Sequence, residues 1–297
     1  MSSRSVAPFE RLIARFTAWA QSQPDIRAAV IVGSQARVDH PADEWADLDL
    51  ILVTADPDRY LSSTEWLENI GNPWLAFLEK TATGEEWERR VLFEGGLDVD
   101  FAILSAGKIQ QILRHEIPPE AADIFRPGMR VLLDKDGVAA KLSASAPRQA
   151  SPRPPTRDEF LEVVNDFWYH ALWTAKHLRR GELWWAKGGL DYYMKWNCLL
   201  RVIEWHTRAT RGWNYNTWHG GRFLEEWADP RVLQGLRGAF AHYDEEDVKR
   251  ALFATMDLFR WIAAETAEKL GYPYPTEADE HVTELVNNCL SASTTEG

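Results

Sequence analysis

The stretch AVIVGSQARVDHPADEWADLDLILVT, residues 29–54, places a loop between two short apolar runs. Ala28–Val32 and Leu48–Thr54 are rich in β-branched and aliphatic residues, which predicts two buried strands. The first run is followed directly by Gly33 and Ser34. A strand that ends in Gly-Ser suits the close approach of a phosphate, because Gly33 has no side chain to keep a ligand away and Ser34 offers a hydroxyl and a backbone N–H.

Two aspartates stand where the second run begins. Asp47 and Asp49 are two residues apart in an extended segment, so their side chains share one face. Two carboxylates on one face repel each other unless a cation lies between them, and Mg²⁺ binds carboxylates together with phosphate oxygens and water. The pattern predicts a magnesium site beside a phosphate-binding turn. The Gly-Ser pair alone, or the aspartate pair alone, is also compatible with an ordinary turn or a solvated strand entrance.

A third carboxylate follows in GGLDVDFAIL, residues 95–104, where Asp98 and Asp100 again share a face. Asp100 lies inside an apolar run, where an unpaired charge is costly, and this favours a functional role; Asp98 is more simply explained as a surface residue. If this strand lies beside Asp47 and Asp49, a three-carboxylate site results. Two carboxylates would hold metal, and Asp100 would complete the site or act as general base toward an attacking hydroxyl.

Composition limits the class of protein. The chain has 297 residues, 45% of them hydrophobic, which is enough for one large or two ordinary domains. It has no run of about 18 apolar residues, and its N-terminus lacks the apolar core of a signal peptide. Cys198 and Cys289 make neither a disulfide framework nor a metal cluster, so we expect a cytoplasmic protein with no membrane partner. The net charge of −12 argues against nucleic-acid binding and favours cationic partners, or simply solubility.

The chain divides into two predicted domains joined by a linker. In residues 1–142 we expect helices and strands in turn: a helix at Phe9–Ser22, the two strands described above, a hairpin at Val91–Leu104 that turns at Gly95-Gly96, a helix at Ala106–His115 and a last strand at Val131–Leu133. Residues 143–156 read SASAPRQASPRPPT, which is rich in Pro, Ser and Ala and predicts an extended linker.

Residues 157–286 predict a domain that is almost wholly helical. Thr156 is a plausible N-cap, and Glu159 would complete a capping box at the start of a helix that ends near Arg179. Further helices are expected at Leu183–Arg208 and Glu246–Leu270, and the polar tail 287–297 is expected to be disordered. Most of the 15 tryptophans should be core residues, while a few would line a cleft and pack against a sugar or a cation.

The order Gly-Ser, then Asp-x-Asp, then a later strand Asp resembles the signature of the nucleotidyltransferase superfamily. Longer segments resemble the aminoglycoside 6-adenylyltransferase family, also called the streptomycin adenylyltransferases: IRAAVIVGS, ADLDLILVT, WLENIGNPW, VLFEGGLDVDFAIL, ELWWAKGGLDYYMKWNCLLRVIEWH and HGGRFLEEW. The resemblance covers most of the chain. It implies an α/β (α+β) nucleotidyltransferase domain with a mixed sheet, an all-helical C-terminal domain, and an active site in the cleft between them.

The resemblance also implies a reaction: transfer of AMP from ATP to a hydroxyl of an aminoglycoside, with streptomycin as the expected acceptor, and release of pyrophosphate. Gly33 and Ser34 match the family's nucleotide-binding turn. Asp47 and Asp49 match the Mg²⁺ ligands, and Asp100 matches the third carboxylate, which would complete the metal site and act as base.

Positive charge is needed near the leaving pyrophosphate, and we expect Lys187, Arg222 and Arg37 to supply it beside Mg²⁺. For Lys187 and Arg222 the alternative is an ordinary surface position. The sequence departs from its relatives at two places. They often have Arg directly after Gly-Ser, where this chain has Gln35, and they tend to have Gly-Lys where this chain has HGGR, residues 219–222.

A polycationic acceptor requires an acidic site. Glu182 stands just before a pair of tryptophans and Glu94 lies in the predicted hairpin, so we expect these two, with Trp185, to bind the acceptor. Three alternatives stay open: a different small alcohol such as a lincosamide, a protein side chain as acceptor, or a non-catalytic nucleotide-sensing protein on the same fold. The sequence does not predict the oligomeric state.

Overall fold

The computed structural model describes residues 6–81, 84, 86–112, 128–145 and 153–291. The chain forms two compact units, Met1–Ala150 and Ser151–Gly297, and their boundary falls within the predicted linker. The linker prediction itself is wrong at its start, because helix α5 (Val138–Ser145) extends into it. Burial of Val138 and Ala139 against the sheet anchors that helix.

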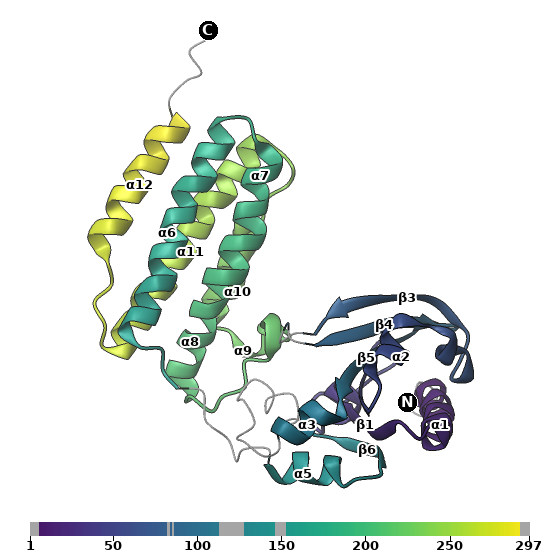
Figure 1. The fold of residues 1–297 in the computed structure, drawn as a ribbon. Helices are drawn as coiled ribbons and strands as arrows, with labels where there is room; N and C mark the ends of the chain where they lie inside the picture. Colours follow the sequence, from purple (N-terminus) through teal and green to yellow (C-terminus); the bar gives the residue numbers. More distant parts are fainter. Residues whose placement is uncertain (1–5, 82–83, 85, 113–127, 146–152, 292–297) are drawn as a thin grey trace. The chain divides into compact units, whose positions relative to one another are not determined.

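The first unit is a six-stranded mixed sheet with helices on it, which is the predicted fold class (Figure 1). The strand order is β3-β4-β5-β2-β1-β6; β2 and β5 are parallel and every other neighbouring pair is antiparallel. Its elements are α1 (Val6–Ser22), β1 (Ile26–Val32), the 3₁₀ turn η1 (Gly33–Gln35), β2 (Leu48–Thr54), α2 (Pro57–Ser62), the 3₁₀ helix η2 (Glu65–Asn69), β3 (Pro73–Lys80), β4 (Trp87–Phe93), β5 (Leu97–Ser105), α3 (Ala106–Ile112), β6 (Arg130–Asp134) and α5.

Alternation along the strands gives the sheet two apolar faces. One packs against α1, whose buried stripe follows the 3.6-residue period: Phe9, Leu12, Ile13, Phe16 and Ala20. The other face packs against α3 and α5 through Val30, Val32, Ile51 and Val53. Asp49 precedes Ile51 by two residues and therefore belongs to this second face.

Two elements of the first unit differ from the prediction. Strand β3 was not predicted; its side chains are mostly exposed and follow no apolar alternation, because it is an edge strand of the sheet. Strand β4 begins at Trp87, four residues before the predicted hairpin. The predicted helix at Ala106–His115 is present as α3 to Ile112, and residues 113–115 lie outside the described residues.

The second unit is helical, as predicted. Its helices are α6 (Arg157–Arg179), α7 (Leu183–Gly188), the π-helical segment η3 (Gly189–Leu199), α8 (Leu200–Arg211), the short 3₁₀ helix η4 (His219–Gly221), α9 (Leu224–Trp227), α10 (Pro230–Ala239), α11 (Glu245–Leu270) and α12 (Thr276–Ser291). The capping box is confirmed: the Glu159 backbone N–H donates to Thr156 Oγ1 at 3.2 Å, and the Thr156 N–H donates to Glu159 Oε2 at 2.7 Å.

The prediction of a disordered tail from residue 287 is wrong as far as Ser291, where α12 ends. Cys289 and Leu290 pack against the hydrophobic core of the unit, and these contacts hold the last turn of the helix. Residues 292–297 lie outside the described residues. Among the helices within the described ranges, none has the length and apolar character that a bilayer crossing requires.

Candidate active site

The turn after β1 is shaped by the contact between Gly33 and Asp49. Gly33 has φ +67°, and a Cβ placed on it would lie 2.0 Å from Asp49 Oδ2. Val32 and Asp49 are register partners in the β1–β2 pair, so the Asp49 carboxylate lies directly against the turn. Sequence reasoning explained Gly33 by the approach of a phosphate; the structure shows that its missing side chain makes room for an aspartate of the same chain.

Three aspartates meet beside this turn. Asp47 immediately precedes β2, Asp49 lies on β2, and Asp100 is the register partner of Asp49 on the parallel strand β5. Each can offer one carboxylate oxygen, and these oxygens all lie within 4.8 Å of one another. The buried Ser34 links turn and site, since its hydroxyl donates to the backbone carbonyl of Asp47 at 3.4 Å.

Asp100 is the buried member of the group. Burial is the main cause that raises the pKa of its carboxyl to about 7; Arg90 opposes this rise, while Glu88, Asp98 and Asp49 add to it. Its Oδ1 is buried without a hydrogen-bond partner. A buried carboxylate oxygen without a donor, next to two more carboxylates, is a donor set that fits a hard divalent cation such as Mg²⁺.

Arg90 on β4 is a residue of this site that the sequence did not suggest. It is the register partner of Asp100, and its Nη2 lies 3.3 Å from Asp100 Oδ2. The Nε atom lies 2.8 Å from Glu79 Oε2 and 3.1 Å from Glu88 Oε1. The signal available in the sequence was the alternation in WERRVLF, which places Glu88 and Arg90 on one face once β4 is extended back to Trp87.

Two further predicted residues of the first unit lie in turns. Arg37 follows the Gly-Ser turn, and its Nε donates to the backbone carbonyl of His40 at 2.7 Å. Glu94 lies in the β4–β5 turn, where its Oε2 accepts from Asn72 Nδ2 at 3.4 Å. Glu94 is four residues along the chain from Arg90, a separation of about 13 Å in extended backbone. The structure therefore places Arg37 near the Gly-Ser turn and Glu94 in the β4–β5 turn, three residues before β5 begins.

The predicted phosphate-binding residues of the second unit have contacts inside that unit. Lys187 Nζ donates to Asp191 Oδ2 and to the backbone carbonyl of Ala241. Lys195, which was not predicted, donates to Asp191 Oδ1 at 2.8 Å, and burial lowers its pKa to about 8 although Asp191 opposes this. Arg222 is exposed and follows the glycine turn of His219–Gly221.

The predicted acceptor residues of the second unit are close to each other. Glu182 accepts from His177 Nδ1 and, at 2.7 Å, from Arg180 Nε; these hydrogen bonds lower the pKa of its carboxyl. The Trp173 ring lies 4.0 Å from the His177 ring and 5.7 Å from the half-exposed Trp185 ring. Glu182 and Trp185 are thus connected on this unit through the rings of His177 and Trp173.

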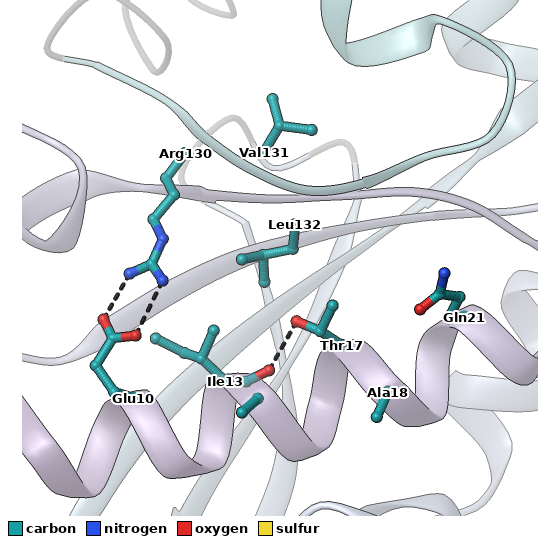
Figure 2. Close-up of a pocket in the computed structure, with 9 residues that line it drawn as sticks. Glu10, Ile13, Thr17, Ala18, Gln21, Arg130, Val131 and Leu132 are labelled. Carbon is teal, nitrogen blue, oxygen red and sulfur yellow. Dashed lines mark hydrogen bonds and ion pairs between the residues drawn. The ribbon is translucent and has the colours of Figure 1, made fainter.

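A hollow of about 470 Å³ lies between α1 and β6 (Figure 2). Arg130 spans it with two hydrogen bonds to Glu10, at 2.6 and 2.9 Å. Arg130 pairs in register with Ile31, which belongs to the face that α1 covers. The hollow is therefore on the side of the sheet opposite Asp49 and contains none of the predicted site residues.

A mixed sheet that brings a Gly-Ser turn and three aspartates together is what the resemblance to nucleotidyltransferases implies, and the match to a family model assigns the chain to that class. The family model described as streptomycin adenylyltransferase matches residues 9–289. The chain belongs to that family.

Two curated relatives match over most of their length. The aminoglycoside 6-adenylyltransferase of Bacillus subtilis is 25% identical over 277 residues, covering 90% of this chain and 93% of that protein. The enzyme of the same name from Campylobacter jejuni is 24% identical over 271 residues, covering 90% and 91%. Among solved structures, an aminoglycoside 6-adenyltransferase from Bacillus subtilis is 20% identical with a TM-score of 0.46, covering 98% of this chain and 100% of that one.

Proposed function

We propose that this protein transfers AMP from ATP to a hydroxyl of an aminoglycoside, with streptomycin as the first acceptor to test, and releases pyrophosphate. The observation that carries the proposal is the group formed by Asp47, Asp49 and Asp100 beside the Gly33–Ser34 turn. Membership of the streptomycin adenylyltransferase family supports it, as do relatives that are named for this reaction.

The chemistry follows from where each group lies. Mg²⁺ held by Asp47, Asp49 and Asp100 would supply the positive charge that the α-phosphate requires. Asp100 takes the proton of the acceptor hydroxyl, because its Oδ1 is a buried carboxylate oxygen without a hydrogen-bond partner and can accept it. As the new O–P bond forms, the bond between the α- and β-phosphates breaks and pyrophosphate leaves. Backbone N–H groups of the Gly-Ser turn orient the phosphates.

Charge on the leaving pyrophosphate requires cations from the protein. Arg37 lies just after the turn, and we assign Lys187 and Arg222 to the same task. Lys187 and Lys195 share the single carboxylate of Asp191, so the three side chains carry a net positive charge when both lysines are protonated. An excess of positive charge is the property that a triphosphate-binding segment needs.

Glu182 and Trp185 are assigned to the acceptor, and Glu94 is a third candidate. The carboxylate of Glu182 would bind an ammonium or guanidinium group, and the half-exposed Trp185 ring offers a flat face to a sugar ring. The net charge of −12 attracts a polycation to the surface in general.

Mass spectrometry of streptomycin, other aminoglycosides and a lincosamide, each incubated with the protein, ATP and Mg²⁺, tests the reaction. We expect one adenylyl group on an aminoglycoside, and no product when EDTA removes the divalent cation. Absence of any adduct from folded protein that still binds ATP would contradict the proposal. A lincosamide adduct in place of an aminoglycoside adduct would keep the reaction and change the acceptor.

Glu182→Gln should raise the KM for the aminoglycoside about 10-fold and leave the KM for ATP within about twofold, because a lost charged hydrogen bond costs about 1.5 kcal/mol. Steady-state kinetics with each substrate varied in turn would measure both constants. Glu284→Gln, on the exposed face of α12, is the matched control and should change neither. Equal changes in both constants would remove Glu182 from the acceptor site.

A further inference from the structure

Arg90 lies on the same face of the sheet as Asp49 and Asp100 and in the same row. Arg90 on β4 is the register partner of Asp100 on β5, which is the register partner of Asp49 on β2. Directly opposed residues on adjacent strands hold their Cβ atoms about 4.5–5.5 Å apart, so these three side chains are immediate neighbours across the sheet. The three strands are adjacent in the sheet in the order β4-β5-β2, and Figure 1 shows β4 beside β5.

The contacts of Arg90 divide between two sides. Its Nη2 lies 3.3 Å from Asp100 Oδ2, toward the aspartate group. On the other side, its Nε lies 2.8 Å from Glu79 Oε2 and 3.1 Å from Glu88 Oε1. Because carboxylates on three strands hold the guanidinium, its orientation is set before any ligand binds.

The two oxygens of Asp100 therefore have different surroundings. Oδ2 faces the Arg90 guanidinium, whereas Oδ1 is buried without a hydrogen-bond partner. The terminal torsion of an aspartate is broad, so an aspartate beside another aspartate needs a fixed partner to keep one orientation. The ion pair with Arg90 supplies that partner.

We propose that Arg90 is a positioning residue for AMP transfer: it holds Asp100 by Oδ2, so that Oδ1 is the oxygen presented to the metal and the acceptor hydroxyl. The inference rests on the proposed function and deepens it, because it assigns the two oxygens of one carboxylate to different tasks. Glu79 and Glu88 act on Asp100 only indirectly, because their ion pairs orient Arg90.

Arg90→Met is expected to lower kcat about 10- to 100-fold and to leave the KM values for ATP and acceptor within about threefold, since a small misplacement of a reacting group costs rate more than binding. Arg90→Lys keeps the charge and should return kcat to within about fivefold of wild type. Arg130→Met is the matched control: Arg130 is 43% exposed against 42% for Arg90 and is also ion-paired, but on the opposite face of the sheet.

Crystal structures of wild type and Arg90→Met give a readout that does not depend on turnover. We expect the Asp100 carboxylate to turn from its wild-type orientation while Asp49 stays against Gly33. An unmoved Asp100 together with wild-type kcat would overturn the inference and leave the proposed function intact. If wild type transfers no AMP to any acceptor, the proposed function fails, and the orientation of Asp100 still decides the role of Arg90. Arg90→Gln replaces Arg90→Met if the latter does not fold.

Discussion

Asp49→Ala should lower kcat for AMP transfer about 10³-fold while the protein still binds the acceptor. Bound metal contributes several kcal/mol of transition-state stabilisation, and about 4 kcal/mol corresponds to that factor in rate. Asp49 is adjacent both to the Gly-Ser turn and to the third aspartate, because it lies against Gly33 and is the register partner of Asp100. Single-turnover transfer of labelled AMP, with acceptor binding measured by calorimetry, tests both halves of this prediction.

Asp98→Ala is the control for Asp49→Ala. Asp98 lies on β5 two residues from Asp100 but is exposed, so its loss should change kcat by less than about fivefold. Turnover of Asp49→Ala within about tenfold of wild type would show that Asp49 is not a metal ligand in the reaction. An equal loss in both variants would mean that the negative charge of the region matters more than the position of one carboxylate.

The aspartate group could be anticipated in part from the sequence. The spacing of Asp47 and Asp49 follows from strand geometry, and Asp100 stood out because a carboxylate within an apolar run needs a partner. The spacing could not show that β5 pairs with β2 and places Asp100 opposite Asp49, because pairing between distant strands is a tertiary property. The expectation that Asp100 lies beside Asp47 and Asp49 therefore rested on the resemblance to known enzymes and not on residue spacing.

Arg90 and β3 show what the local sequence could not predict. Strand β3 is an edge strand with large apolar side chains exposed along it, so it lacks the alternation that marks a half-buried strand. The sequence did not predict β3, and it predicted that the β4 segment begins at Val91. Arg90 was therefore expected to lie outside the sheet. Its ion pairs with Glu79 and Asp100 depend on three strands being in register.

Lys187 shows a related limit. The spacing of four residues to Asp191 suggests an ion pair on a helix, and the structure contains it. Lys195 is also four residues from Asp191 and pairs with it, so the same spacing suggests that ion pair as well. The spacing does not show that Lys195 is buried or that Lys187 contacts the Ala241 carbonyl, because both depend on packing between helices.

Gly33→Ala is the smallest substitution from which we expect a large loss of activity. The added methyl would lie 2.0 Å from Asp49 Oδ2, so the Asp49 carboxylate or the turn must move by more than about 1 Å to restore an ordinary contact. A displacement of that size at a reacting centre costs about 10²-fold in rate, and we expect kcat to fall by this factor or more. Steady-state kinetics and thermal unfolding of the same preparation would measure the effect on activity and on stability.

Gly95→Ala separates the contact at Gly33 from backbone strain. Gly95 has φ +87°, comparable to the +67° of Gly33, but a Cβ on it would meet no atom within 4 Å. Both variants force alanine into the left-handed region at a cost of about 1 kcal/mol, so both should lose similar stability from this cause. Only Gly33→Ala displaces Asp49, and so only that variant should lose most of its activity. If the two variants keep equal activity, the close approach of Asp49 to the turn is not the arrangement in which AMP is transferred, and the metal ligands must be sought with Asp49 in another orientation.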